Sequence, residues 1–259
     1  MEQKKVAHNM QHLLHRLDIQ NEITTPEAME LLQVSEATAR RLFAKMAQNG
    51  SAVRTFGGIR LAGKNAEEYN YDALVDRNRA AKLSLALRAV SLVRSKDILF
   101  LDGGTTLALF AAELARRIRG DELKNVSVFT NSLSTLKELH DVEGITLLGG
   151  RFRSKRQDFC GHLTETALRQ LHFSKCFLGT DAIEADRGFT TTDFETAQLN
   201  SLVLHVSKQS YVLADASKFG ETSLTPFSPA SGVSAVITEE TLPSAVKGTY
   251  EAAGFRFRG

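Results

Sequence analysis

The start of the chain has apolar residues at a spacing of three and four, which is typical of short amphipathic helices. Four of them lie at i, i+3, i+4 and i+7: Met10, Leu13, Leu14 and Leu17. This spacing predicts a first helix that runs to about Leu17. Thr25 is a good N-cap and Pro26 suits the first helical position, so we expect a second helix after them. Its short apolar face is Ala28, Leu31 and Leu32.

A third helix is expected almost directly after the second. Gln33 and Val34 predict a tight turn, and Ser35 is the expected N-cap. The apolar residues that follow have helical spacing and predict a buried stripe: Ala39, Leu42, Phe43 and Met46. Asn49-Gly50 is a typical helix end.

Two short apolar segments after this helix predict a hairpin. Residues 51–55 and 59–61 can form strands around Phe56-Gly57-Gly58, whose glycines tolerate the positive φ of a tight turn. Three helices and a hairpin in this order predict a winged helix-turn-helix, the hairpin being the wing. The same elements also occur as a plain cap or as a dimerisation element, and that alternative stays open.

The charge distribution supports DNA binding more than the net charge of +2 does. No Asp or Glu lies between Ala37 and Ala66, whereas the basic residues there are Arg40, Arg41, Lys45, Arg54, Arg60 and Lys64. Such a run is often only a solvated face, but here several of its members lie on the third helix, away from the apolar stripe. The expected DNA-contacting residues are Ser35, Ala37, Thr38, Arg40, Arg41, Lys45, Arg54 and Gly57.

The rest of the chain alternates apolar runs with helical patterns, which predicts a parallel α/β sheet. The expected strands are 98–101, 126–130, 145–148, 176–178, 211–214 and 235–238. The expected helices are 80–93, 107–119, 133–140, 163–171, 194–206 and 242–253. Residues 64–76 lack periodicity, so we expect a DNA-binding domain at 1–63, a linker at 64–76 and an α/β sensor domain at 77–259.

Small, hydroxylated and charged residues follow the expected strands one after another. In open α/β sheets, ligands bind in the crevice beyond the carboxyl ends of the strands. The candidate ligand-binding residues are Asp102, Gly103, Gly104, Thr105, Thr106, Asn131, Ser132, Gly149, Gly150, Arg151, Gly179, Asp181 and Lys218. Residues 215–217 belong to the last of these loops.

The residue types in these loops suit a phosphorylated sugar. Gly103 and Gly104 let the backbone approach a ligand, and the helix N-terminus at Thr105 favours an anion. Asn131 and Ser132 can donate to phosphate or sugar oxygens; Asp102 and Asp181 can accept from sugar hydroxyls, and Lys218 or Arg151 can balance negative charge.

Each of these features also has a purely structural interpretation. A Gly-Gly-Thr-Thr turn is often a plain helix start, and Asp102 can equally cap the next helix. The basic loop with Arg153, Lys155 and Arg156 is expected to be solvated. Residues 188–192 could close over a ligand or form an ordinary N-cap.

The composition of the chain excludes several other classes of protein. The chain has 259 residues, 42% of them hydrophobic and 24% charged, with no apolar run long enough to span a membrane, so we expect two domains in the cytosol. Cys160 and Cys176 form no C-x-x-C pair and should be free thiols. No histidine has metal-ligand spacing, and no P-loop is present, so neither a metal nor another cofactor is expected.

The chain resembles the DeoR family of sugar-operon regulators in both halves. The N-terminal motif is Val34-Ser35-Glu36-Ala37-Thr38-Ala39-Arg40-Arg41, followed by Gly50 and Arg54-Thr55-Phe56-Gly57-Gly58. The sensor motifs are residues 100–106, 130–132, 148–150, 177–179 with Gly188, and 215–220. The resemblance implies a sensor fold related to ribose-5-phosphate isomerase, operator DNA as partner, and a phosphorylated sugar or polyol as effector.

Three positions depart from the usual family pattern. Leu42-Phe43 replaces Asp-Leu after the arginine pair, Ala39 replaces Ile before it, and Asp102-Gly103-Gly104 replaces Asp-Ser-Gly. The first two lie on the recognition helix, so the operator preference of relatives does not transfer. The third removes one hydroxyl from the expected phosphate loop.

Two other functions are alternatives to that of a repressor released by its effector. A sugar-phosphate isomerase or transferase could use Asp102, Asp181, Glu195, Asp215 and Lys218 for acid-base work. Such an enzyme has no evident use for a basic helix-turn-helix, and a pure interaction module does not explain the loops. Helix-turn-helix proteins usually pair to match a two-fold operator, so we expect a homo-dimer or homo-tetramer.

Overall fold

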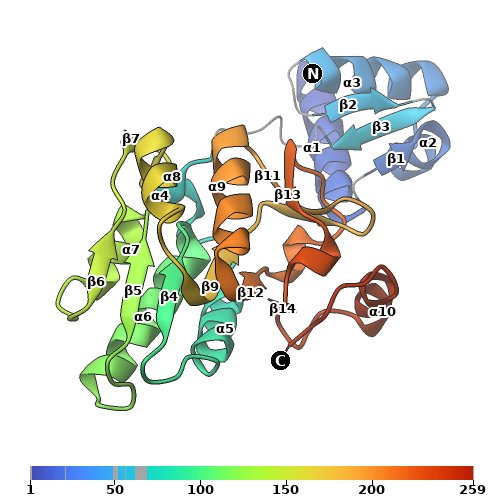
Figure 1. Ribbon diagram of the computed structural model, residues 1–259. Coiled ribbons are helices and arrows are strands. Elements are labelled where there is room, and N and C mark those ends of the chain that lie inside the picture. Colours follow the sequence, from blue (N-terminus) through green and yellow to red (C-terminus); the bar gives the residue numbers. More distant parts are fainter. Residues whose placement is uncertain (1, 21, 49–51, 56, 62–68, 259) are drawn as a thin grey trace. The chain divides into compact units, whose positions relative to one another are not determined.

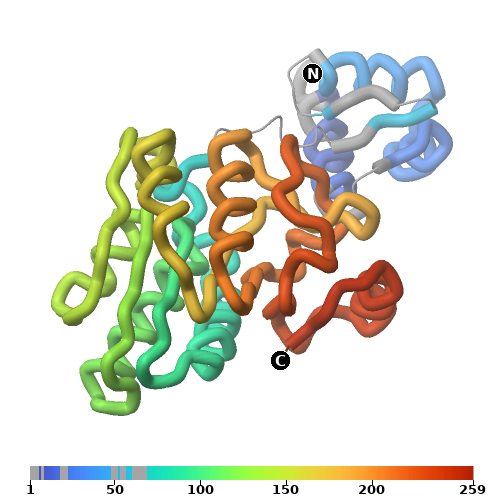
Figure 2. Tube along the Cα trace, viewed as in Figure 1, coloured from blue at the N-terminus to red at the C-terminus, as the bar shows by residue number. Residues whose placement is uncertain are grey.

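The computed structural model describes residues 2–20, 22–48, 52–55, 57–61 and 69–258 (Figures 1 and 2). The chain divides into two units, Met1–Glu67 and Glu68–Gly259. A short helix, α4 (Tyr71–Leu74), belongs to the second unit and lies within the range expected to be a linker.

The N-terminal unit is a winged helix-turn-helix, as the sequence predicts. Its elements are α1 (Glu2–Gln20), β1 (Glu22–Thr24), α2 (Thr25–Leu32), α3 (Glu36–Gln48), β2 (Ala52–Thr55) and β3 (Gly58–Leu61). The strands form an antiparallel sheet in the order β1-β3-β2. Strand β1 was not predicted, because three residues are too few to show the alternation of a strand.

The apolar stripes of the three helices meet in one core. Leu13 and Leu17 of α1, Ala28 of α2, and Leu42, Phe43 and Met46 of α3 are all buried. Leu31 is not part of this core, contrary to expectation, because 41% of its surface is exposed. Among its neighbours, Leu32 packs against the core instead.

The N-cap of α2 is Thr24, one residue before the expected Thr25. The backbone N–H of Thr24 donates to the Glu27 carboxylate at 2.7 Å, and Glu27 N donates to Thr24 Oγ1 at 3.4 Å, which completes a capping box. Thr25 has another use: its N–H and its hydroxyl both donate to the Gly57 carbonyl at 2.8 Å. This pair of bonds ties the start of α2 to the hairpin turn.

The two glycines of the hairpin turn are needed for different reasons. Gly57 has φ +98°, which favours glycine. Gly58 lies in β3 without a positive φ, contrary to expectation, but an added Cβ would lie 2.4 Å from the Ile23 carbonyl oxygen of β1. Gly50, Ser51, Phe56 and Lys64, and the side chains of Gln48, Arg54 and Arg60, lie outside the described residues.

The second unit is built on a six-stranded parallel sheet in the order β14-β12-β9-β4-β5-β6 (Figure 1). These strands are β4 (Ile98–Leu101), β5 (Ser127–Thr130), β6 (Ile145–Leu147), β9 (Phe173–Gly179), β12 (Ser207–Leu213) and β14 (Ala235–Ile237). The main helices are α5 (Arg79–Val90), α6 (Thr105–Arg119), α7 (Leu133–Leu139), α8 (His162–Leu168), α9 (Phe194–His205) and α10 (Ser244–Ala252). All six strands and all six helices match predicted segments.

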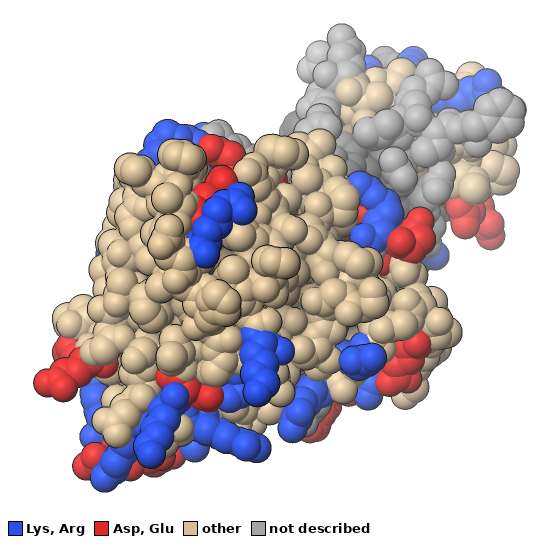
Figure 3. Space-filling model, viewed as in Figure 1, with Lys and Arg blue, Asp and Glu red and all other residues tan. Residues whose placement is uncertain are grey.

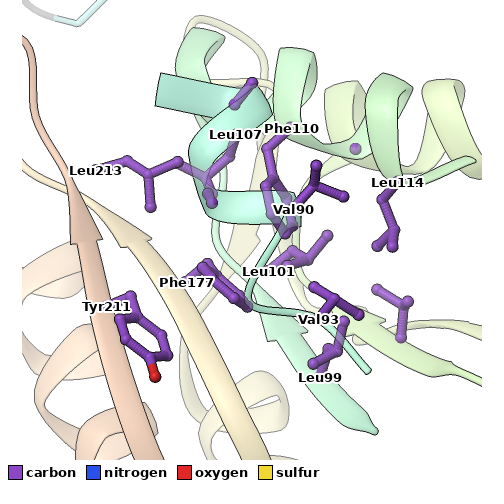
Figure 4. Close-up of a cluster of buried hydrophobic side chains, with 14 of the residues drawn as sticks. Val90, Val93, Leu99, Leu101, Leu107, Phe110, Leu114, Phe177, Tyr211 and Leu213 are labelled. Carbon is purple, nitrogen blue, oxygen red and sulfur yellow. The ribbon is translucent and has the colours of Figure 1, made fainter. Parts of the chain in front are cut away.

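Both faces of this sheet are buried, which explains the continuous apolar runs in the sequence. Along β4, Leu99 and Leu101 point to one face and Phe100 to the other. The first face packs against α5 and α6 in the cluster that includes Phe110 and Phe177 (Figure 4). The second face packs against residues of α8, α9 and α10. The sheet is therefore the middle layer of an α/β/α arrangement.

Several short elements were not predicted. They are the antiparallel pair β7 (Arg151–Arg153) and β8 (Asp158–Cys160), the antiparallel sheet of β10 (Ala182–Glu184), β11 (Gly188–Thr191) and β13 (Thr225–Ser228), and the 3₁₀ turns Ala216–Lys218 and Ala230–Gly232. Residues 188–191 are thus a buried strand and not a loop that could close over a ligand. Among the helices that the structure describes, none is both long and apolar enough to cross a membrane.

Candidate functional site

The outer face of α3 is the candidate DNA-binding surface. Ala37, Arg40, Arg41, Ala44 and Lys45 are exposed, because the apolar stripe turns the opposite face of α3 into the core. Thr38 is half-buried, and its N–H lies 3.4 Å from Ser35 Oγ, as expected for an N-cap at Ser35. Small residues beside basic ones allow the backbone of a recognition helix to approach the floor of a major groove.

The basic residues of α3 differ in what they contact. Arg40 pairs with Glu36 one turn earlier, at 2.6 Å. Neither Arg41 nor Lys45 forms an ion pair with any residue that the structure describes. Over the visible face of the second unit, by contrast, Lys and Arg are interspersed with Asp and Glu (Figure 3).

The candidate effector crevice lies at the carboxyl ends of β4 and β9. The chain leaves β4 toward β5 and β6 and later returns to the other side of β4 with β9, so the strand order reverses here. Crevices in α/β sheets form at such a point. Asp102 and Gly179, the ends of the two strands, are joined by a 3.3 Å bond from Gly179 N to Asp102 Oδ2.

Asp102 is a buried carboxyl group between these two strand ends. Its Oδ1 accepts from Gly103 N at 2.7 Å. Burial raises the pKa of Asp102 to about 6; the bond from Gly103 opposes this shift, and the charge of Asp158 adds to it. Asp102 does not cap α6, because the N-cap is Gly104 and no side chain of the described residues caps that helix.

The start of α6 is suited to an anion. Gly104 has φ +107°, so glycine is favoured there, and the first backbone N–H groups of α6 receive no cap from any side chain that the structure describes. Thr105 is buried and Thr106 is half-buried in this first turn. Gly103 is close to the next loop, since an added Cβ would lie 3.4 Å from Ser132 Cβ.

Asn131 and Ser132 are largely engaged within the protein. Asn131 Nδ2 donates to the Phe159 carbonyl at 2.9 Å, whereas Asn131 Oδ1 is buried without a hydrogen-bond partner among the described residues. Ser132 is fully buried and caps α7 by accepting from Thr135 N at 3.2 Å. Both residues therefore hold the end of β5 against β8.

Gly149, Gly150 and Arg151 also make contacts that serve packing. An added Cβ at Gly150 would lie 2.3 Å from Thr164 Oγ1, so this glycine permits close contact with α8. The Gly149 carbonyl accepts from the same hydroxyl at 2.9 Å. Arg151 is exposed and pairs with Glu195.

Asp181 is held by the end of β11. Its Oδ2 accepts from Thr191 Oγ1 at 2.9 Å, from Thr192 N at 2.8 Å and from Thr192 Oγ1 at 3.0 Å. The threonine-rich segment therefore orients Asp181, and the N-cap of α9 is Asp193.

Lys218 lies in a polar cluster at the carboxyl end of β12. Asp215 caps the short turn that holds Lys218 and accepts from Ser217 N at 3.0 Å. Lys82 of α5 was missed at the sequence level; it is 6% exposed and donates to the Leu74 carbonyl at 2.6 Å. Burial lowers the pKa of Lys82, with Asp215 opposing the shift and Lys218 adding to it.

Of the basic residues at the turn between β7 and β8, Lys155 is exposed as expected, but Arg153 and Arg156 are not solvated, contrary to expectation. Arg153 and Arg156 have side chains that are 12% and 15% exposed. Arg153 pairs with Asp158 at 2.7 Å and with Asp193 at 2.8 Å, and Arg156 pairs with Asp193 at 3.1 Å. Asp193 lies about forty residues further along the chain, and nothing in the local sequence pairs it with this loop.

Tyr69 is a second residue that sequence reasoning missed. Its hydroxyl would lie 3.4 Å from a Cβ added to Gly104, so it stands beside the start of α6. Its ring lies under the Arg156 guanidinium, 4.2 Å from Cζ to the ring centroid. Burial raises the pKa of Tyr69, and the nearby charge of Arg156 opposes this shift.

Both halves of the chain match known protein families. Residues 10–65 match the DeoR-like helix-turn-helix domain, and residues 77–240 match the DeoR C terminal sensor domain. Among solved structures, ribose 5-phosphate isomerase A from Methanocaldococcus jannaschii is similar with a TM-score of 0.42 and 24% identity, over 56% of each chain.

Curated relatives are similar over most of their length. The lactose phosphotransferase system repressor of Lactococcus lactis subsp. lactis is 32% identical, over 81% of this chain and 82% of the relative. The protein of the same name in Streptococcus mutans is 31% identical, over 84% and 85%. Transcriptional repressor AccR of Agrobacterium fabrum is 29% identical, over 86% and 88%. With its winged helix and its parallel-sheet sensor, the chain belongs to the DeoR family of DNA-binding transcriptional regulators.

Proposed function

We propose that this regulator represses a carbohydrate-utilisation operon in the cytosol and leaves its operator when a phosphorylated sugar or polyol binds the sensor. The observation that carries the proposal is the start of α6, where the N-cap is Gly104 with φ +107° and, within the part of the chain that the structure describes, no side chain caps the first N–H groups of the helix. This helix start lies at the reversal of strand order, where α/β sheets bind ligands. The repressor names of the relatives support the direction of control.

The groups around the crevice suit the two ends of such an effector. The phosphate would take hydrogen bonds from the start of α6 and gain charge balance from Lys218 and Lys82. Asp102 would face the hydroxyl groups, since a carboxyl group with a pKa near 6 can accept or donate a hydrogen bond near neutral pH. Arg151 and Asp181 would act indirectly, because Glu195 and the threonines of β11 already engage them.

The DNA-binding unit would use α3 in the major groove. Arg41 and Lys45 would contact bases or phosphates, while Ala37 and Thr38 permit close approach. Release then requires that the effector bind the DNA-incompetent state more tightly, and a coupling of about 1 to 3 kcal/mol corresponds to roughly 5- to 150-fold in operator affinity. A homo-dimer would match a two-fold operator.

Turnover of the ligand is the competing function, and the geometry favours binding alone. Of the five groups that could do acid-base work, Asp181 accepts three hydrogen bonds, Glu195 pairs with Arg151, and Asp215 caps a turn. These carboxylates are committed to structural partners. Asp102, with its pKa raised to about 6, is a single candidate for acid-base work, and one such group does not make an isomerase.

A thermal-shift screen tests the proposal without knowledge of the operator. The probes are ribose 5-phosphate, fructose 6-phosphate, glycerol 3-phosphate and inorganic phosphate, each beside its unphosphorylated parent where one exists. A true effector at a hundred times its Kd stabilises the protein by about 2.7 kcal/mol, whereas its parent should not. Equal stabilisation by the parents, no response to any phosphorylated probe, or conversion of a sugar phosphate to product would contradict the proposal.

A further inference from the structure

Tyr69 occupies a position that the proposed function does not explain. It follows directly in sequence after residues 62–68, which join the two units, and it is the first residue of the second unit that the structure describes. Its hydroxyl stands beside Gly104, the N-cap of α6, at the phosphate end of the crevice. Tyr69 is therefore close to the linker in sequence and close to the crevice in space.

The segment around Tyr69 is fastened to the loop between β7 and β8. Arg156 of that loop covers the Tyr69 ring, Tyr71 N donates to the Lys155 carbonyl at 2.8 Å, and Gln157 Nε2 donates to Asp72 Oδ1 at 3.1 Å. Arg156 is in turn held by Asp193 at 3.1 Å and by Thr192 Oγ1 at 3.1 Å. A shift of Tyr69 would therefore alter an organised set of contacts.

The chemistry of Tyr69 suits contact with an anion at the start of α6. Its hydroxyl can donate one hydrogen bond, and Asp102 and Asp181 are close enough that their charges raise its pKa further, after burial. A phosphate between these carboxylates would be repelled unless donors faced it, and the Tyr69 hydroxyl and the α6 N–H groups are such donors. The Arg156 guanidinium, which lies over the Tyr69 ring, adds a positive charge next to the hydroxyl-bearing side chain.

We propose that Tyr69 is an effector-contacting residue and the one through which the occupied crevice is coupled to the DNA-binding unit. The phosphate accepts a hydrogen bond from the Tyr69 hydroxyl and so stabilises the arrangement in which the ring lies between Gly104 and Arg156. Operator binding favours another position of the Tyr69 side chain. This inference rests on the proposed function, since it needs an effector in the crevice.

The test measures operator affinity with and without saturating effector in two variants of Tyr69 and one control. The effector is whichever probe of the thermal-shift panel stabilises the wild type most. Tyr69→Phe keeps the ring on Arg156 and loses only the hydroxyl, so effector affinity should fall about tenfold. Tyr69→Ala should still bind effector in the thermal-shift assay, but saturating effector should change its operator affinity less than twofold.

Tyr71→Phe is the matched control, because Tyr71 lies two residues away and its hydroxyl interacts with Ser134 instead of the crevice. It should keep the wild-type response. The chain contains no Trp, so Tyr69→Trp and Tyr71→Trp each create a single fluorescent reporter. Effector should change the emission of the first variant and leave that of the second nearly constant.

The possible results separate this inference from the function on which it rests. If wild type releases the operator and Tyr69→Ala does so to the same extent, Tyr69 does not couple the crevice to DNA binding, and the inference is overturned alone. If the Tyr69→Trp variant binds effector without any change in its fluorescence emission, the proposed contact between residue 69 and the effector is overturned. If no phosphorylated probe stabilises or releases the wild type, the proposed function fails and the inference fails with it.

Discussion

Arg153 and Asp158 form a two-point ion pair, with Arg153 Nε 2.8 Å from Asp158 Oδ1 and Nη2 2.7 Å from Oδ2. Burial would lower the pKa of Arg153, but Asp158 outweighs that effect and raises it. The pair closes the β7–β8 turn and, through Asp193, fixes the start of α9 beside it.

Arg153→Met should destabilise the protein by about 3 kcal/mol, because it removes the two-point partner of the buried Asp158 carboxylate and leaves it the more distant Arg156, at 3.6 Å. Arg151→Met is the matched control two residues away, since its ion pair with Glu195 is exposed and should contribute much less. Urea unfolding of both variants measures the difference. Similar midpoints for the two would contradict the structural role of this cluster.

Asp102 should give the protein a measurable pH dependence. Burial raises its pKa to about 6, above the ordinary value of 3.8 for an aspartate, so the folded state binds more protons between these values. Its contribution to stability is therefore full below about pH 4 and is lost as the pH rises through 6. The free energy of unfolding of wild type relative to Asp102→Asn should fall by up to about 3 kcal/mol from pH 4 to pH 7.

Asp97 is the control for that experiment, because its pKa shift has the opposite sign. Burial raises the pKa of Asp97, but hydrogen bonds from Lys175, the Arg94 N–H and Ser174, together with the Lys175 charge, lower it by more. Its contribution is present above pH 4 and is lost as the pH falls. Wild type relative to Asp97→Asn should thus gain stability as the pH rises. An unchanged stability difference between wild type and Asp102→Asn from pH 4 to pH 7 would refute the raised pKa of Asp102.

Arg41→Ala should weaken operator binding by about 1 to 3 kcal/mol if Arg41 contacts a base. Arg40→Ala should also weaken binding, because Arg40 of the wild type can exchange its exposed ion pair with Glu36 for a contact with DNA. Arg94→Ala removes an exposed arginine of the second unit and is the control. Fluorescence anisotropy on a duplex selected from random sequence, at matched salt, measures all three; unchanged affinity in both α3 variants would remove α3 as the recognition helix.

Thr106→Leu and Lys218→Ala should separate effector response from DNA binding. Thr106 lies in the first turn of α6 and Lys218 at the carboxyl end of β12, so both changes affect the proposed phosphate site and neither affects α3. Operator affinity should be unchanged, and the effector concentration for half-release should rise at least tenfold. Lys208→Ala, at the amino end of β12, should behave as wild type.

The parallel sheet could be predicted because its strands are buried on both faces. Val212 packs on one side of β12, and Tyr211 and Leu213 pack on the other, so the run is apolar throughout. The short strands β1, β7, β8 and β10 were missed because each has three residues with at least one charged residue among them, so they show neither a period nor the uncharged run that marks β6 and β14. Nor does local sequence show that Arg153 will meet Asp193 or that Tyr69 will reach Gly104.

The loops of the candidate site could be predicted because each of them follows a strand, but the role of each side chain could not. Asn131 and Ser132 look like ligand donors in sequence, but Asn131 joins the end of β5 to β8 and Ser132 caps α7. Lys82 looks like an ordinary helix residue, and burial beside Asp215 and Lys218 makes it a candidate. Such roles depend on contacts between segments far apart in the chain.

Operator release is the most direct test of the account. Labelled operator duplex bound to the wild-type protein is titrated with the phosphorylated compound that stabilises the protein most and, separately, with its unphosphorylated parent. The account predicts that the phosphorylated compound lowers operator affinity at least fivefold and that the parent has no effect at the same concentrations. Equal release by the parent, or no release by the phosphorylated compound, would contradict a phosphate-sensing crevice that controls DNA binding.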